Sequence, residues 1–494
     1  MRTTAPKDVV KLLSGSLVAK VFGIGAVMLF ARVLPKDQMA IFPAYLMLAG
    51  LSTLFVTFGI YAAFVREVPS LLRTDEARAR SLVMTGSGVI LAGTLIPCVA
   101  AWWWSDAIAA FVFKNAAQGW VIRIMVPGFL AYVVSKTADQ IMWGRAQFGA
   151  TSILQILESI VRPVATVALW FWLGYRGIVF GLVIAQFVMA AVAFWCVRDM
   201  FLGPLPALYP LRKLFSESMP YYIGNYLSYL RGDGDSILVS FLGPAALAEY
   251  YIAKTLFTNM ALVWAAVDRV AAERLARFAL TESFADKVRA LHVRICQMMI
   301  PFDLLAIAVA PGALVVLAGA RYSNATWPAI ILLVAMLVQF ISIPYDRAVY
   351  VSLSGMIRLK FTILEAVVVV VSAAILVPLA GVTGVAAARI IAPLGVCIFG
   401  AWIMRRHLGL VLPLRPMLLA LATAAPGAAL ALVLVPTAHG VASALSAMTL
   451  ASLIWVSSTV VLAWFLDRPM LLALGAEVFP RYRAAVSSWG VLRG

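Results

Sequence analysis

Charged residues are scarce in this chain. Only 12% of its 494 residues are Asp, Glu, Lys or Arg, whereas 63% are hydrophobic and the mean hydropathy is +0.97. A soluble domain carries roughly 25% charged residues, because charge keeps its surface in water. A chain this long with so few charges cannot cover a water-facing surface. The composition therefore excludes a soluble globular protein and indicates one embedded in lipid.

Cysteine and histidine are scarce as well. The 4 cysteines lie far apart in apolar stretches without a CxxC pair, and the 3 histidines form no cluster. No metal site and no cofactor are expected from this pattern. The absence of a GxxxxGK[ST] motif excludes ATP hydrolysis by a P-loop. Asp233-Gly-Asp235 resembles the metal-binding DxD of glycosyltransferases, but the motif is too short to be specific and lies in or beside an apolar run.

Acidic residues are fewer than basic ones, 22 Asp and Glu against 39 Lys and Arg, which gives a net charge of +17. A strongly basic chain often binds nucleic acid, but the cytoplasmic loops of membrane proteins are also enriched in Lys and Arg. We therefore expect no nucleic-acid partner. The partner that the composition indicates is the lipid bilayer itself.

Long apolar runs fill most of the chain. A helix needs about 20 mostly apolar residues to cross the hydrocarbon. Runs of this kind predict fourteen membrane-spanning helices, near residues 11–33, 39–65, 81–103, 119–142, 151–173, 177–197, 214–242, 245–268, 291–318, 325–351, 360–379, 383–404, 415–436 and 441–466.

The loops between these runs predict the orientation. With the N-terminus in the cytoplasm, 26 Lys and Arg residues fall on the cytoplasmic side and 4 on the other. This is a strong positive-inside asymmetry. We expect a multi-pass protein of the bacterial inner membrane with both termini cytoplasmic. The outer loops are short and leave no room for an external catalytic domain.

The sequence repeats itself at an offset of 207 residues. Without a gap from about 136 to 198, the offset pairs Asp139 with Asp346, Glu158 with Glu365, Gly174 and Gly177 with Gly381 and Gly384, Trp195 with Trp402, and Arg198 with Arg405. Because the offset covers six spans, an even number, the two halves share one orientation. Parallel repeats of this kind are a transporter architecture.

The expected fold is therefore an all-α polytopic membrane protein with about fourteen helices, in two parallel-repeat six-helix bundles plus a final pair. The corresponding domains are residues 1–203, 204–412 and 413–494. A substrate path is expected between the two bundles, near the middle of the membrane.

Several charges fall inside the expected spans, where a charge at the bilayer centre costs roughly 2.5–3.5 kcal/mol. Some have near partners: Glu158 and Arg162 are four residues apart, Arg231 and Asp235 likewise, and Lys136 and Asp139 three. Lys20, Lys254 and Arg389 have none nearby in sequence. These three and Arg231 are the candidate contacts for an anionic substrate.

The seventh run, PYYIGNYLSYLRGDGDS, is tyrosine-rich and interrupted by glycine. We expect it to be broken by Pro220, Gly224, Gly232 and Gly234. Tyr222, Tyr226 and Tyr229 recur at spacings of four and three, so they share a helix face. With Asn225 they suit contact with a sugar or a lipid headgroup. An aromatic belt at the membrane interface is the alternative.

The chain resembles the Wzx-type polysaccharide flippases over essentially its whole length. The resemblance rests on the opening SLVAKVFGIGAVMLFARVLPKDQMAIFPAYLML, on ILVSFLGPAALAEYYIAKTL, and on the basic segment ending near VRALHVRICQMMIPF. The short turns Gly174-Tyr-Arg-Gly177 and Gly381-Val-Thr-Gly384 also resemble the family's turns before spans six and twelve. This arrangement is similar to the multidrug/oligosaccharidyl-lipid/polysaccharide exporter superfamily.

The resemblance implies a flippase that moves a polyprenyl-diphosphate-linked oligosaccharide from the cytoplasmic to the outer leaflet by alternating access. A polysaccharide polymerase and export machinery are the implied partners. Coupling to a proton or sodium gradient would use inward-facing carboxylates, for which Asp139, Asp233, Asp235 and Glu158 are the candidates.

Other readings remain open. Lipid II flippases and multidrug antiporters share the implied fold; the antiporters usually have twelve spans and acidic cavities. A polytopic glycosyltransferase or polymerase is the enzyme alternative, but it needs a sizeable outer loop with acidic residues. We therefore expect a transporter and no catalytic residues.

Overall fold

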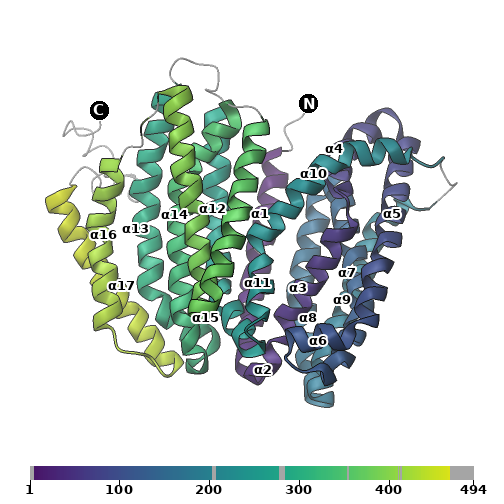
Figure 1. Ribbon diagram of the computed structural model, residues 1–494, viewed down its shortest axis with the longest axis horizontal. Coiled ribbons are helices and arrows are strands. Elements are labelled where there is room, and N and C mark those ends of the chain that lie inside the picture. Colours follow the sequence, from purple (N-terminus) through teal and green to yellow (C-terminus); the bar gives the residue numbers. More distant parts are fainter. Residues whose placement is uncertain are drawn as a thin grey trace. The chain divides into compact units, whose positions relative to one another are not determined.

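The computed structural model describes residues 5–202, 207–276, 284–352, 355–409, 411 and 414–467, and every regular element in these ranges is a helix (Figure 1). The contacts divide the chain into two compact units, unit 1 (residues 1–251) and unit 2 (residues 252–494). One helix, α12 (Pro244–Ala276), begins in unit 1 and ends in unit 2.

Unit 1 contains the first thirteen helical elements and the start of α12. They are α1 (Ala5–Val33), α2 (Lys36–Met39), α3 (Ile41–Val56), α4 (Ile60–Thr74), α5 (Glu76–Trp103), α6 (Ser105–Val112), η1 (Ala116–Gln118), α7 (Gly119–Gly144), α8 (Phe148–Leu173), α9 (Tyr175–Val197), η2 (Arg198–Met200) and α10 (Leu211–Gly232), followed by α11 (Gly234–Ser240).

Unit 2 contains the remaining helices. They are α13 (Phe284–Ala318), η3 (Ala320–Ala325), α14 (Thr326–Ser352), α15 (Gly355–Leu408), α16 (Leu414–Leu434) and α17 (Val441–Leu466).

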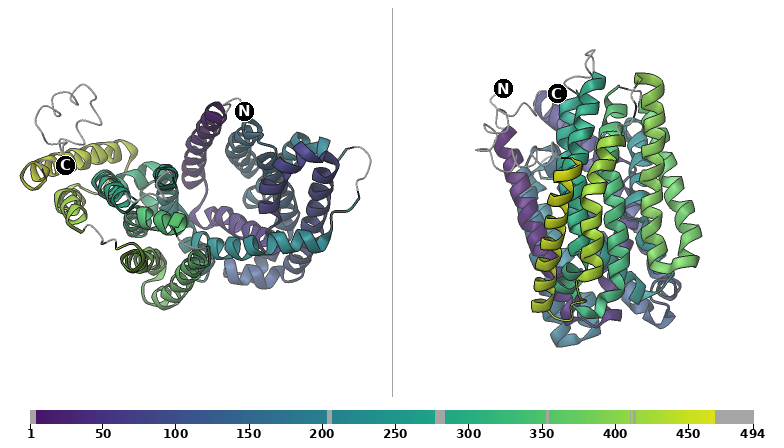
Figure 2. Two further views of the ribbon diagram at one scale, coloured as in Figure 1. Left: turned by 90° about the horizontal axis from the view of Figure 1, so that it is seen from above. Right: turned by 90° about the vertical axis from the view of Figure 1, so that its left-hand side faces the viewer.

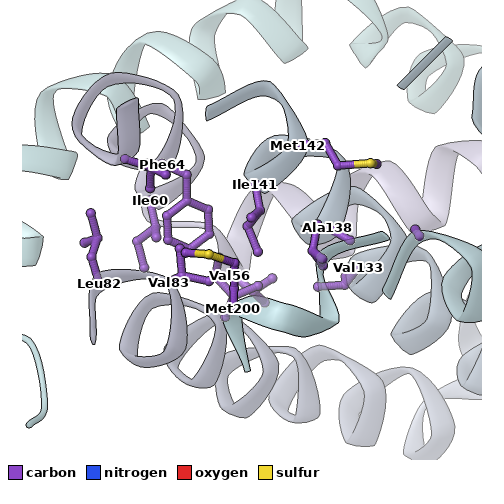
Figure 3. Close-up of a cluster of buried hydrophobic side chains, with 14 of the residues drawn as sticks. Val56, Ile60, Phe64, Leu82, Val83, Val133, Ala138, Ile141, Met142 and Met200 are labelled. Carbon is purple, nitrogen blue, oxygen red and sulfur yellow. The ribbon is translucent and has the colours of Figure 1, made fainter. Parts of the chain in front are cut away.

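Unit 1 is a bundle centred on α7. Helices α3, α4, α5 and α9 all contact α7, and α1 lies alongside α8 (Figure 2). The core is an apolar cluster in which Ile60 and Phe64 of α4 meet Leu82 and Val83 of α5 and Ile141 of α7 (Figure 3). This cluster fixes α7, which carries part of the site described below.

Unit 2 is built around α13, which contacts α14, α16 and α17. Helix α16 presents Ala420, Ala424, Ala428 and Ala431 to this core, all buried. Small residues at spacings of three and four let the backbones of membrane helices approach closely. Helix α14 in turn packs along α15.

The all-helical membrane fold class is confirmed, but the count of fourteen spans is not. Eleven helical runs among the described residues are long and apolar enough to cross a membrane, and none of them includes α10, α11 or α12. One run, Ile363–Arg406, has 44 residues, about 66 Å of helix or twice the hydrocarbon thickness. It is broken at Gly381, where the backbone is not helical.

Two expected spans differ from the observed helices. The run 39–65 is broken at residues 57–59, because Phe58 and Gly59 adopt left-handed φ angles of 44° and 76°. A Cβ on Gly59 would lie 2.1 Å from the carbonyl oxygen of Ser218, so only glycine lets α10 pass this close. In the seventh run, α10 continues through Pro220 and Gly224 and ends at Gly232.

The turns between α8 and α9 and within α15 confirm the repeat at the level of the backbone. Gly174 has φ 56° and ψ −134°, and Gly381, 207 residues later, has φ 55° and ψ −131°. A Cβ on Gly177 would lie 1.9 Å from the oxygen of Leu169, and one on Gly384 would lie 2.1 Å from that of Leu376. The boundaries of the three expected domains remain predictions.

Candidate functional site

A polar cluster lies on the membrane-spanning helices α7 and α8 of unit 1. Glu158 of α8 is paired with Arg162, one turn along the same helix, and its Oε2 lies 3.7 Å from Nζ of Lys136 on α7. The expected pairing of Glu158 with Arg162 is therefore confirmed. The expected pairing of Lys136 with Asp139 is wrong, because the lysine reaches across to the neighbouring helix instead. We call Lys136, Glu158 and Arg162 the α7–α8 charge cluster.

Aromatic and amide groups line the α7–α8 charge cluster. The guanidinium of Arg162 lies 5.8 Å from the ring centroid of Phe42, and its Nη2 donates to Gln186 Oε1 at 3.5 Å. Nζ of Lys136 lies 5.4 Å from the Tyr132 ring centroid. The exposed side-chain fractions are 33% for Lys136, 23% for Glu158 and 13% for Arg162. Two cations that share one carboxylate are thus open to a small anionic group.

Asp139 lies next to the α7–α8 charge cluster on α7. Its neighbours Ala138 and Ile141 belong to the apolar core of unit 1 (Figure 3). Its Oδ1 is buried without a hydrogen-bond partner among the described residues. An unpartnered carboxylate oxygen is costly to bury as a charge.

Lys20 is placed on the neighbouring helix α1. Ser16 donates to Gln155 of α8 at 3.0 Å, and a Cβ on Gly15 would lie 2.4 Å from Cβ of Ser152. Near the other end, Trp170 of α8 donates to Gln38 at 3.2 Å, so α1 and α8 run in the same direction. Lys20 is one turn beyond Ser16, at the height where α8 carries Glu158. It is half-buried, and no ion pair of Lys20 is found in the described ranges.

The tyrosines of α10 share one face, as predicted, and that face packs against α3 and the turn after it. Tyr222 lies 5.8 Å from the ring of Phe58, and Tyr226 lies 6.4 Å from that of Phe55. Tyr229 donates its hydroxyl proton to the carbonyl of Met47 at 3.2 Å. Asn225 is exposed. Helix packing therefore accounts for much of the tyrosine spacing.

The carboxylates after α10 have different surroundings. Asp233 occupies the single residue between α10 and α11 and is exposed. Asp235 is buried and accepts a hydrogen bond from the hydroxyl of Tyr250 at 2.5 Å. The side chain of Arg231, expected to pair with Asp235, lies outside the described part of the chain.

The unit 2 candidates come from two helices, α12 and α15. Lys254 is half-buried on α12. Arg389 is buried, with its guanidinium 5.3 Å from the Phe257 ring centroid. Arg347, also an intramembrane charge in the sequence, donates to Asp268 at 2.5 Å.

The repeat does not duplicate the α7–α8 charge cluster. Glu365 stands where the first half has Glu158, but the positions that match Lys136 and Arg162 hold Ile343 and Val369. The sequence positions of the two cations are therefore not repeated in the second half.

Sequence reasoning missed two polar features of α13. Asp303 is fully buried and neither of its carboxylate oxygens has a hydrogen-bond partner among the described residues. His292 is also fully buried, with Nε2 3.3 Å from Sγ of Cys296. The sequence did carry a signal for Asp303. It is an acidic residue inside the apolar run 291–318, and no basic residue lies three or four positions away from it. In the described ranges no group of His, Cys, Asp or Glu side chains is arranged to hold a metal ion.

Comparison with known structures shows the same fold in two transporter groups. The lipid II flippase MurJ in an inward closed conformation superposes with a TM-score of 0.73 at 13% identity, covering 92% of this chain and 99% of that one. A multidrug resistance MATE family transporter of the MOP superfamily, in an inward-facing conformation, gives a TM-score of 0.60 at 15% identity, covering 81% and 98%.

Among curated proteins no sequence matches. The family model described as "Polysaccharide biosynthesis protein" matches residues 6–269, which is more than half of the chain. The chain therefore belongs to the polysaccharide biosynthesis protein family and has the same fold as these two transporters.

Proposed function

We propose that this protein flips a polyprenyl-diphosphate-linked oligosaccharide from the cytoplasmic to the outer leaflet of the bacterial inner membrane. The observation that carries the proposal is the α7–α8 charge cluster, in a protein of the polysaccharide biosynthesis family. Both termini are cytoplasmic in this proposal, as the basic loops indicate. A polymerase and export machinery would take up the flipped product.

The diphosphate is the part of such a substrate that a membrane resists most, because its charges lose their water. Lys136 and Arg162 provide two cations within reach of one carboxylate. Arginine binds phosphate oxygens through its planar fork, and lysine binds them as a compact charge. Before the substrate binds, Glu158 keeps the two cations in place through its ion pairs. The diphosphate then replaces Glu158 as their anionic partner.

The remaining candidates take secondary roles. Lys20, at the height of Glu158 on α1, adds a third cation from the adjacent helix. Asn225, Tyr222, Tyr226 and Tyr229 of α10 are proposed to contact the saccharide, and Arg231 stays a proposed contact from the sequence alone. Lys254 and Arg389 are proposed contacts in unit 2, although Arg389 is already covered by Phe257.

Ion coupling is proposed to use the carboxylates of unit 1. Glu158 is held by two cations and Asp235 by the Tyr250 hydroxyl, whereas the buried oxygen of Asp139 has no partner in the described ranges. Of these candidates and the exposed Asp233, Asp139 is therefore the best placed to take up a proton or sodium ion.

The proposal is tested by lipid analysis of a strain that lacks the protein. We expect complete diphosphate-linked oligosaccharides to accumulate on the cytoplasmic face, as shown by leaflet-selective labelling. The wild-type protein should restore export, and so should the control Lys213→Gln, which removes an exposed lysine that pairs with Glu217. Lys136→Met and Arg162→Met should not restore it, although the proteins reach the membrane.

Each alternative predicts a different result in this strain. Truncated glycans would indicate a glycosyltransferase, and a complete glycan with altered drug sensitivity would indicate a multidrug antiporter. Growth arrest with accumulated peptidoglycan precursor would indicate a lipid II flippase. Any of these results would contradict the proposed substrate.

A further inference from the structure

A cavity with a volume of about 270 Å³ lies in unit 2, where α12 ends and α13 begins. Three of the residues that line it are basic, namely Arg274 of α12 and both Lys287 and Arg294 of α13. No acidic side chain of the described residues lines the cavity. None of the three basic residues belongs to the α7–α8 charge cluster or to the other candidate contacts of the proposed substrate. The cavity therefore needs an explanation of its own.

The cavity is held in shape by apolar packing. Leu275 and Leu291 line it, and both belong to an apolar cluster that also includes Val288 of α13 and residues of α14 and α15. Lys287 and Arg294 are seven residues apart, so they lie on one face of α13, two turns from each other. The cluster fixes the end of α12 against the start of α13, and the basic side chains stay around one cavity without help from an anion.

The charges around the cavity are suited to an anion. Arg274 and Arg294 are exposed, and the described part of the chain contains no ion-pair partner for either. Asp286 precedes Lys287 on α13 but does not line the cavity. Like charges around one small space repel each other, so a bound anion would relieve the repulsion. Arginine forks and a lysine ammonium together are the donors that bind phosphate oxygens well.

Apolar side chains continue from the cations along the same helix faces. Met298 and Phe302 follow Arg294 by one and two turns, about 6 and 12 Å along α13, and are 38% and 40% exposed. On α12, Val270 precedes Arg274 by one turn and is 48% exposed. A phospholipid has the same order of charge and apolar surface, with a phosphate at one end and acyl chains beyond it. A free phosphate ion would make use of the cations only.

The predicted orientation brings the cavity to the leaflet in which such a lipid would lie. The charge asymmetry of the loops predicts that the end of α12 and the start of α13 face the cytoplasm. Basic pockets between membrane helices on that side bind phosphate-bearing headgroups. The volume is slightly below the roughly 300–1,000 Å³ of pockets that enclose a whole small molecule. It therefore suits a headgroup whose chains remain outside the cavity.

We propose that this cavity binds the phosphate headgroup of an anionic phospholipid from the cytoplasmic leaflet. Arg274, Lys287 and Arg294 contact the phosphate. Met298 and Phe302 lie along the acyl chains. This lipid is bound and not transported, so the inference goes beyond the proposed function and does not depend on it. Because the headgroup contacts both helices, its binding stabilises the junction between α12 and α13.

Native mass spectrometry of the purified full-length protein in detergent, with dioleoyl phosphatidylglycerol added, tests the site. Arg274→Gln and Arg294→Gln should each weaken lipid binding about fivefold, because each removes one cation that attracts the headgroup. Arg294→Lys should keep most of the affinity, because the charge remains. The matched control is Arg289→Gln, which removes an exposed cation of α13 that does not line the cavity. Equal weakening by Arg289→Gln would overturn the proposal, because surface charge in general would then explain the binding.

Two competitors identify the part of the lipid that is recognised. Inorganic phosphate should not displace phosphatidylglycerol, and displacement at equal concentration would overturn the proposal in favour of a site for a soluble phosphate. Dioleoyl phosphatidylcholine has the same chains but a neutral headgroup, so it should bind much more weakly. Equal binding of the two lipids would also overturn the proposal, because the chains alone would then carry the affinity.

Thermal unfolding provides a second measurement and checks that the variants fold. Without added lipid, the double variant Arg274→Gln/Arg294→Gln should unfold at the temperature of the wild-type protein, because both side chains are exposed. Phosphatidylglycerol should raise the unfolding temperature of the wild-type protein and of Arg289→Gln, since a ligand stabilises the state that binds it. An equal rise in the double variant would contradict the assigned contacts and overturn the site.

Discussion

Glu158 is the residue on which the α7–α8 charge cluster depends. It is the carboxylate that Lys136 and Arg162 share, and all three side chains are at least two-thirds buried. Removing one partner of a buried ion pair is far more costly than replacing the whole pair, because it leaves charge without compensation. The cluster is therefore stable only as a set, unless an anionic substrate replaces the carboxylate.

Glu158→Gln should lower the free energy of unfolding by about 1–3 kcal/mol, since two cations are left facing each other. Adding Lys136→Gln should recover part of this loss, because the repulsion is removed. The measurement is denaturant unfolding in micelles. Glu217→Gln, which breaks the Lys213 pair at 3.7 Å, is the control and should cost under about 0.5 kcal/mol. Equal losses in the two single variants would show that the cluster does not act as a unit.

Sequence spacing predicted contacts within one helix but not contacts between helices. The four-residue spacing of Glu158 and Arg162 is enough to predict their pairing, because both lie on one helix face. The partner of Lys136 lies across a helix contact, which no spacing encodes. Asp303 was overlooked for the same reason, since its burial is set by the helices that pack around α13, which no spacing along the chain encodes.

At the scale of the helices, the two glycine turns are the clearest trace of the repeat. Gly174 and Gly381 have nearly identical backbone angles with positive φ, which favours glycine. Three residues later, Gly177 and Gly384 allow the next helix to cross the preceding one in direct backbone contact. The repeat was predictable because these steric demands constrain residue type. The continuous helix through Pro220 was not, because membrane helices tolerate proline inside them.

Gly177→Ala and Gly384→Ala should each destabilise the protein by about 1–3 kcal/mol, because the new Cβ overlaps a backbone carbonyl that cannot move aside. Gly88→Ala on α5 is the matched control, since nothing lies within 4 Å of its Cβ position. It should be neutral or stabilising by about 0.5–1 kcal/mol. Thermal unfolding in detergent compares the three. A neutral Gly177→Ala would mean that the helix crossing is looser than described.

At the scale of the whole molecule, the composition was sufficient to predict the environment and the fold class. Scarcity of charge required lipid, and the family and fold comparisons agree with that reading. The number of spans was less predictable. Helices α10 and α12 carry polar and charged residues among the apolar ones, so length and apolarity alone do not identify them as spans.

The orientation is a separate prediction about the whole molecule. In a variant whose four cysteines are replaced, Arg78→Cys should react with an impermeant thiol reagent only from the cytoplasmic side. His439→Cys should react only from the outside. Both positions are exposed and lie at the starts of α5 and α17. Labelling of both from the same side would contradict the positive-inside assignment.

The central claim is that this protein alone moves a polyprenyl-diphosphate-linked oligosaccharide across a bilayer. Purified protein would be reconstituted into vesicles that hold this lipid in both leaflets, and a glycan-cleaving enzyme added outside would report the accessible fraction. With the wild-type protein, the cleaved fraction should rise from about half to nearly all, whereas Lys136→Met should stay near half. Wild-type vesicles that remain at half cleavage, with the protein folded and the substrate present, would contradict the account.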